Sequence, residues 1–101
     1  MMELKHLLKD IDHNVHEARE KMIKAYRMRD TNKVIADWQR DMAKGHMDYN
    51  VRANELAGKM MNDVAISQDK LAPGLLEAYR DWHGDIMEET AKVNAMIAAY
   101  K

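Results

Sequence analysis

Hydrophobic residues in the first third of the chain recur at alternating intervals of four and three. The positions are Leu4, Leu8, Ile11, Val15, Ala18, Met22 and Ala25. A helix with about 3.6 residues per turn brings such positions onto one line, which forms the seam between helices packed side by side. The spacing therefore predicts a helix over residues 3–29. Leu7 and Tyr26 widen its apolar face.

Two later stretches show the same spacing and predict helices over residues 32–66 and 73–100. The seam of the middle stretch is Ile35, Trp38, Met42, Gly45, Tyr49, Ala53, Leu56, Met60 and Val64. The seam of the last stretch is Leu75, Tyr79, Trp82, Ile86, Val93, Ile97 and Tyr100, with Glu89 or Thr90 in its gap. The side chains that we expect to be buried include Trp38, Leu56, Trp82 and Ile86.

The few helix-breaking residues set the connections. The chain has one Pro and four Gly, which favours long helices. "RDTN" at 29–32 predicts a helix start capped by Asp30 or Thr31. "SQDKLAP" at 67–73 predicts a break, with Pro73 as the first residue of the last helix. Short connections make consecutive helices antiparallel. We therefore expect one all-α domain over 1–101, an antiparallel up-down-up three-helix bundle.

Gly45 lies on the seam of the middle helix. Because Gly costs a helix about 1 kcal/mol relative to Ala, we expect either a kink near Gly45 or a close backbone approach there. Further apolar side chains lie off the seams, and they are Leu7, Tyr26, Met47, Val51, Met61, Leu76 and Met87. A lone bundle would leave part of this surface in water, so the sequence predicts self-association as a two-fold dimer.

Composition narrows the function. A net charge of −1 argues against nucleic acid and anionic membranes as partners. The absence of Cys excludes disulfides and thiolate chemistry. The opening "MMELKHLLKD" is too charged for a signal peptide or a membrane span, so we expect a cytoplasmic protein. No catalytic arrangement, cofactor site or small-molecule substrate site emerges from the spacing, and the chain is not expected to be an enzyme.

The stretch "DIDHNVHEARE" at 10–20 carries the one candidate site. On a helix with the seam given above, a polar stripe lies opposite the core and consists of His6, Asp10, His13, Glu17 and Glu20, with His16 beside it. The candidate metal ligands are His6, Asp10, His13, His16 and Glu17. Spacings of three and four bring such side chains together, as in helical sites for zinc or a similar divalent ion. The other interpretation is a solvated helix face.

Two further features have both structural and functional interpretations. Residues 19–33 hold six cationic and two anionic side chains, a net charge of +4 from six minus two. Cations stabilise a helix C-terminus, and the same cluster suits an acidic partner. His83 lies on a second, weaker apolar strip of the last helix with Leu76, Met87 and Asn94. It is expected to be a hydrogen-bonded core or interface residue rather than a catalytic acid or base.

The sequence thus favours a small non-catalytic helical interaction or assembly protein that forms a homodimer or binds another protein. The alternative is a helical protein that binds a divalent metal such as zinc through the polar stripe on its first helix.

Overall fold

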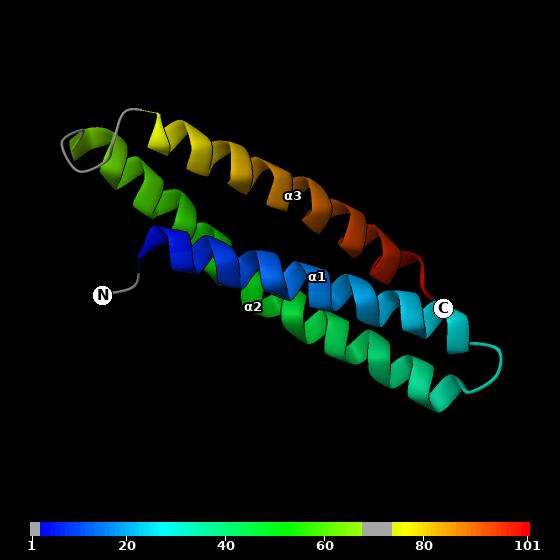
Figure 1. Ribbon diagram of the computed structural model, residues 1–101. Coiled ribbons are helices and arrows are strands. Elements are labelled where there is room, and N and C mark those ends of the chain that lie inside the picture. The colour runs from blue at the N-terminus through cyan, green and yellow to red at the C-terminus, as the bar shows by residue number, and fades with distance from the viewer. Residues whose placement is uncertain (1–2, 68–73) are drawn as a thin grey trace.

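The computed structural model describes residues 3–67 and 74–101, with side chains described for 3–63 and 74–101. Three helices account for nearly all of these residues: α1 (Leu4–Met28), α2 (Lys33–Ser67) and α3 (Leu75–Ala99). Each runs antiparallel to the one before it, in a rod of 56 × 22 × 16 Å (Figure 1). The described part contains no strand. The predicted all-α three-helix bundle is therefore confirmed.

The predicted seam of α1 is confirmed along its whole length. Every one of its seven positions is buried, and so is Leu7. Leu8 and Ile11 are completely inaccessible to solvent. Burying a side chain of this size is worth about 1.5–3 kcal/mol. The face of α1 that packs on α2 and α3 therefore contributes a large part of the hydrophobic core.

The predicted seam of α2 is wrong. Trp38 is 60% exposed and Leu56 is 45% exposed, although both were expected in the core. The line that packs into the bundle instead consists of Ala36, Ala43, Met47, Asn50, Ala53, Ala57 and Met61. Ala53 is the one residue of the predicted seam that is fully buried among the side chains described. Val64, at the end of that seam, lies outside the described side chains.

Complementary size explains why α2 buries this line. The large side chains of the α1 seam need small partners opposite them, because interiors fill at nearly constant density. The Ala residues of α2 let the two helices come close, while Met47 and Met61 fill the remaining space. These two Met residues were expected as surplus surface, and they are part of the core.

α3 packs less deeply than α1. Its fully buried positions are Ile86 and Val93, while Trp82 is half-buried. The predicted burial of Ile86 is thus confirmed, whereas Trp82 is only partly buried. At the end of α3 the Tyr26 hydroxyl donates a hydrogen bond of 2.7 Å to the Met96 carbonyl. The ring of Tyr26 meets the buried Tyr100 edge-on, which fixes the end of the chain on α1.

The helix start after the first connection differs by one residue from the prediction. The Asn32 side-chain oxygen accepts the backbone N–H of Ile35 at 3.3 Å, so Asn32 is the N-cap of α2. Thr31 instead donates its hydroxyl back to the Met28 carbonyl. The predicted break at 67–73, including Pro73, falls almost entirely outside the described residues. Gly74 precedes α3 with φ 83°, a backbone conformation that favours glycine.

Asn50 is a polar residue inside the α1–α2 interface. It is 1% exposed, and its side-chain N–H₂ donates to the Ile11 carbonyl at 3.0 Å. Its side-chain oxygen is buried without a hydrogen-bond partner in the described structure. An unsatisfied buried acceptor costs about 1–3 kcal/mol.

We therefore expect Asn50→Leu to raise the free energy of unfolding by about 1 kcal/mol, as measured by urea denaturation. The Ile11 carbonyl keeps its own helical hydrogen bond, so the substitution leaves no new unsatisfied group. A loss of stability would show that the amide of Asn50 contributes more than its orphaned oxygen costs.

Candidate functional site

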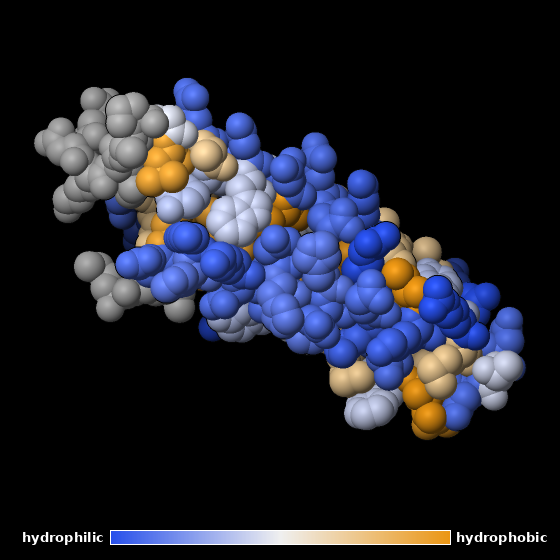
Figure 2. Space-filling model, in the orientation of Figure 1, coloured by the Kyte–Doolittle hydropathy of each residue, from blue (hydrophilic) through white to orange (hydrophobic). Residues whose placement is uncertain are grey.

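A line of exposed apolar side chains runs along the side of α2 that α1 and α3 leave uncovered. We call it the α2 outer face, and it consists of Val34, Ile35, Trp38, Gly45, Tyr49 and Leu56. Val34 is the most exposed, at 80%. Hydrophobic surface is visible at the lower right of Figure 2, where α2 begins. Five of these residues, all but Val34, belong to the seam that the sequence assigned to the core, and in the folded chain they are exposed.

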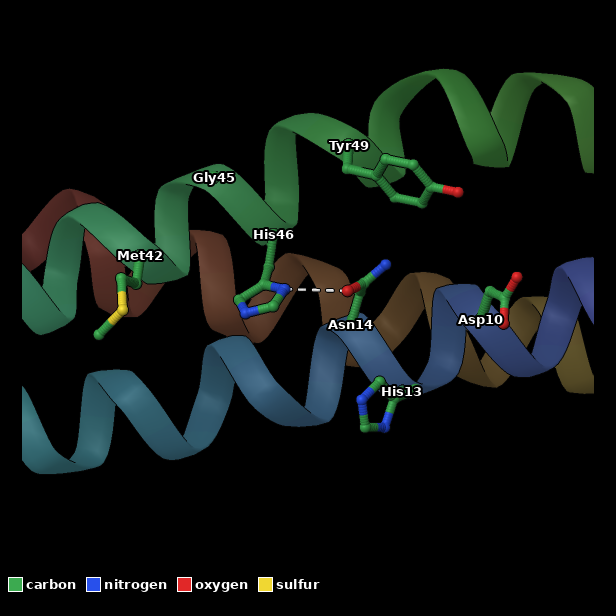
Figure 3. A pocket seen from close by; sticks show the side chains of 7 residues that line it. All are labelled: Asp10, His13, Asn14, Met42, Gly45, His46 and Tyr49. Atoms are coloured by element: carbon green, nitrogen blue, oxygen red, sulfur yellow. Dashed lines mark hydrogen bonds between the residues drawn. The ribbon is translucent and has the colours of Figure 1, made fainter.

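Two open hollows lie along the α2 outer face. The first, of about 560 Å³, is lined by Asp10, His13, Asn14, Met42, Gly45, His46 and Tyr49 (Figure 3). The second, of about 620 Å³, is lined by Leu7, Asp48, Tyr49, Arg52, Ala53 and Leu56. Tyr49 borders both hollows. The outer face is therefore a grooved surface that can accept side chains of a partner.

His46 is a member of the first hollow that the sequence did not identify. Its ring Nδ1–H donates a hydrogen bond of 2.9 Å to the side-chain oxygen of Asn14, so His46 points from α2 toward α1 (Figure 3). The bond joins residues of two different helices that are 32 positions apart in the sequence. Spacing along one helix carries no signal for such a contact, because it depends on the register between α1 and α2.

The predicted polar stripe of α1 is only partly exposed to solvent, because Glu17 is half-buried. His6, Asp10 and His13 are exposed, and Figure 2 shows hydrophilic surface along the middle of the view, where α1 lies in front. His16 forms a 3.3 Å pair with Asp12. Glu17 lies 3.7 Å from Lys21.

The structure does not assemble these residues into a ligand set. In the described part of the chain, no group of three or more His, Cys, Asp or Glu is arranged to hold a metal ion. His13 points away from His46, although both border the first hollow (Figure 3). Metal binding by His6, Asp10, His13, His16 and Glu17 stays a prediction.

We expect His13→Ala to change the free energy of unfolding by less than about 0.5 kcal/mol, since the side chain is exposed. We also expect stoichiometric zinc to leave the unfolding midpoint of the metal-free chain unchanged. A ligand that binds only the folded state must raise that midpoint. A rise with zinc that His13→Ala abolishes would therefore establish the metal site.

A third hollow, of about 430 Å³, lies between α2 and α3. His83 borders it, and its Nε2–H donates to the Asn54 side-chain oxygen at 3.0 Å. The prediction of a hydrogen-bonded His83 is confirmed. Burial lowers the pKa of His83 below its usual 6.5. Asp48 and Glu55 of α2 border the same hollow.

The direction of this pKa shift predicts a weak loss of stability in acid. A folded-state pKa below the unfolded value favours the neutral ring, so the contribution is present above about 6.5 and is lost as the pH falls through the folded-state pKa. We expect His83→Gln, which retains a donor for Asn54, to make the unfolding midpoint depend less on pH between pH 7 and pH 5. An unchanged pH dependence in that variant would contradict this assignment.

Most of the cationic cluster at 19–33 is used within the chain. Arg19 pairs with Glu89 of α3, and Lys33 pairs with Asp37 at 2.7 Å. Asp37 also accepts the Tyr100 hydroxyl at 2.8 Å, and its hydrogen bond from Lys33 is the main cause that lowers the pKa of this carboxyl. The Lys33–Asp37 pair lies within the first turns of α2, and the hydrogen bond from Tyr100 attaches the end of the chain to the start of α2. An acidic partner for this cluster stays a prediction.

No helix in the described ranges is long and apolar enough to cross a membrane. Comparison with protein families, with curated proteins and with solved structures finds no match for this chain. The candidate function therefore depends on the geometry of the molecule itself.

Proposed function

We propose that the chain is a small non-catalytic assembly protein that pairs with a second copy of itself through the α2 outer face. One observation carries the proposal. Seven large hydrophobic side chains are exposed in the described structure, and five of them lie on this single face: Val34, Ile35, Trp38, Tyr49 and Leu56. The other two, Val51 and Met87, lie at the α2–α3 hollow.

An apolar line of this kind is typical of protein interfaces. Large exposed apolar patches on small proteins usually mark contacts. Trp and Tyr are enriched among the residues that contribute most to binding, because they bury a large area and lose little conformational freedom. Trp38 and Tyr49 are both more than half exposed, and Tyr49 lines both hollows of this face. The face therefore has anchors and cavities on the same surface.

A second copy suits this face better than a small or irregular partner. From Val34 to Leu56 the face spans about 33 Å at 1.5 Å per residue, a length matched by another long helix. The chain supplies such a helix itself, since α2 has 35 residues against 25 in α1. Figure 1 shows α2 extending beyond the start of α1. A net charge of −1 gives two copies little mutual repulsion.

Metal binding is the second candidate function. His46 of α2 borders the same hollow as Asp10 and His13 of α1, two of the candidate ligands that the sequence suggests. The zinc titration described above tests it. A metal-dependent rise in stability without self-association would favour this function over assembly.

Sedimentation equilibrium tests the proposed function directly. At tens of micromolar we expect a mass near twice the 11.8 kDa of the chain, falling toward 11.8 kDa on dilution. A mass of one chain at every loading would overturn the proposal. The exposed side chains of α2 would then be ordinary surface residues.

A further inference from the structure

The hollow between α2 and α3 has an exposed rim and a buried floor. Its α2 residues recur at intervals of three and four, so they form two adjacent rows on one side of that helix. The exposed outer row is Asp48, Val51 and Glu55, and the more buried inner row is Met47, Asn50 and Asn54. The opposite wall comes from α3 and consists of His83, Met87, Thr90 and Asn94. Its volume of about 430 Å³ falls within the range of small-molecule sites.

Asn50 supplies this floor with a hydrogen-bond acceptor that the chain itself does not use. The residue is 1% exposed, and its side-chain N–H₂ donates to the Ile11 carbonyl of α1. The nitrogen and the oxygen of one amide diverge, so the oxygen is turned away from that carbonyl, and it has no partner among the described residues. A buried acceptor without a partner destabilises the fold, and folded chains carry such costs mainly at functional sites.

The other polar groups of the hollow give it a negative character. Its lining includes two carboxylates and neither Lys nor Arg. Asp48 and Glu55 form no salt bridge within the part of the chain that the structure describes. The ring N–H of His83 and the hydroxyl of Thr90 already donate hydrogen bonds within the chain. The hollow therefore suits a ligand that brings N–H donors and positive charge.

We propose that the α2–α3 hollow binds a small organic ammonium ion, whose N–H group donates to the Asn50 oxygen and whose charge faces Asp48 and Glu55. This site is separate from the α2 outer face and goes beyond the proposed assembly function. A divalent metal ion does not suit the hollow, because no group of three or more His, Cys, Asp or Glu in the described ranges is arranged to hold one.

The apolar residues of the hollow define the rest of the ligand. Met47, Val51 and Met87 line it, and Val51 and Met87 are two of the exposed large hydrophobic side chains of the chain. They suit a short aliphatic chain attached to the ammonium group. The Asn50 oxygen is closed to solvent in the structure. Unbranched Met side chains change conformation easily, so a ligand can displace Met47 or Met87 to reach it.

Hexylammonium is the probe, and amide chemical shifts of the isotope-labelled chain report where it binds. We expect shifts confined to residues 47–55 and 83–94. The dissociation constant should be millimolar, because the ligand has only about seven non-hydrogen atoms. Hexan-1-ol and hexanoate have the same hydrocarbon chain without the positive charge. We expect the alcohol to bind at least about tenfold more weakly than the ammonium ion and the carboxylate more weakly still.

Two variants separate the floor from the rim. Asn50→Leu removes the acceptor and should weaken hexylammonium at least about tenfold, although the variant is expected to be more stable. Asn62→Leu is its matched control, because Asn62 is exposed on α2 outside the hollow and its loss should leave the affinity unchanged. Glu55→Gln, at an exposed position, should weaken hexylammonium about threefold or more and leave hexan-1-ol unaffected.

Three results would overturn the proposal. Equal affinity for hexylammonium and hexanoate would show that the hollow does not select positive charge. Shifts centred on the α2 outer face would place the ligand elsewhere. Unchanged hexylammonium affinity in both Asn50→Leu and Glu55→Gln would remove the groups on which the site depends. Glu55→Gln decides the matter if Asn50→Leu does not fold, which circular dichroism shows.

Discussion

Trp38→Lys is expected to weaken self-association by about 30-fold or more, the effect of losing 2 kcal/mol or more at a central aromatic anchor. The indole is 60% exposed in the single chain, so its substitution should leave the core of the bundle intact. A lysine is a good helix former, so α2 itself should be unaffected. Dissociation constants from sedimentation equilibrium over a range of loadings measure the effect.

Val51→Lys is the matched control for this experiment. Val51 is 57% exposed on the same helix, but it borders the α2–α3 hollow rather than the outer face. Its substitution should leave the dissociation constant within about threefold of wild type, since surface changes away from an interface shift energies by about 0.5 kcal/mol. Equal weakening by both variants would show that the contact is not confined to the outer face.

Ile11→Ala is expected to lower the free energy of unfolding by about 2–5 kcal/mol. Ile11 is completely buried, and its backbone carbonyl accepts the side chain of Asn50. Removing its methyl groups leaves a cavity between α1 and α2 that rigid helices fill only partly. Urea denaturation of a chain this small should resolve the change, because it amounts to a large fraction of total stability.

Val51→Ala gives the reference for this measurement, and it should change stability by less than about 0.5 kcal/mol. A small effect of Ile11→Ala, comparable to that of the reference, would mean that the α1 seam is not the core of the bundle.

The sequence predicted α1 well because that helix has one apolar line. Its hydrophobic positions all lie on one side, and its opposite side carries Asp10, His13 and Glu17. A helix with a single apolar face can pack only that face into the core. The same reasoning gave the number of helices and their up-down-up order, since few breaks separate three long periodic stretches.

The sequence misled for α2 because that helix carries two apolar lines. One contains large residues such as Trp38 and Leu56, and the other contains small ones such as Ala36, Ala43 and Ala57. Choosing by residue size selects the first line, whereas packing against the bulky α1 seam selects the second. The recurrence of Ala36, Ala43, Asn50 and Ala57 every seven residues was the signal that identifies the buried line.

The candidate site was predictable only in part. The polar stripe of α1 follows from the period of one helix, and the structure places His6, Asp10 and His13 at the surface as that period requires. The hollows depend on which side of α2 meets α1, and that choice could not be made from one helix at a time. His46 and Arg52 were therefore missed, although both line the surface that now defines the candidate interface.

Iodide quenching of Trp38 tests the central claim most directly. Trp82→Phe leaves Trp38 as the single tryptophan, and Trp38→Phe leaves the half-buried Trp82 as a control. If two copies bury the α2 outer face against each other, quenching of Trp38 should fall as protein concentration rises through the dissociation constant, while quenching of Trp82 stays constant. A sedimenting mass that doubles while Trp38 remains equally quenched at every concentration would contradict the account.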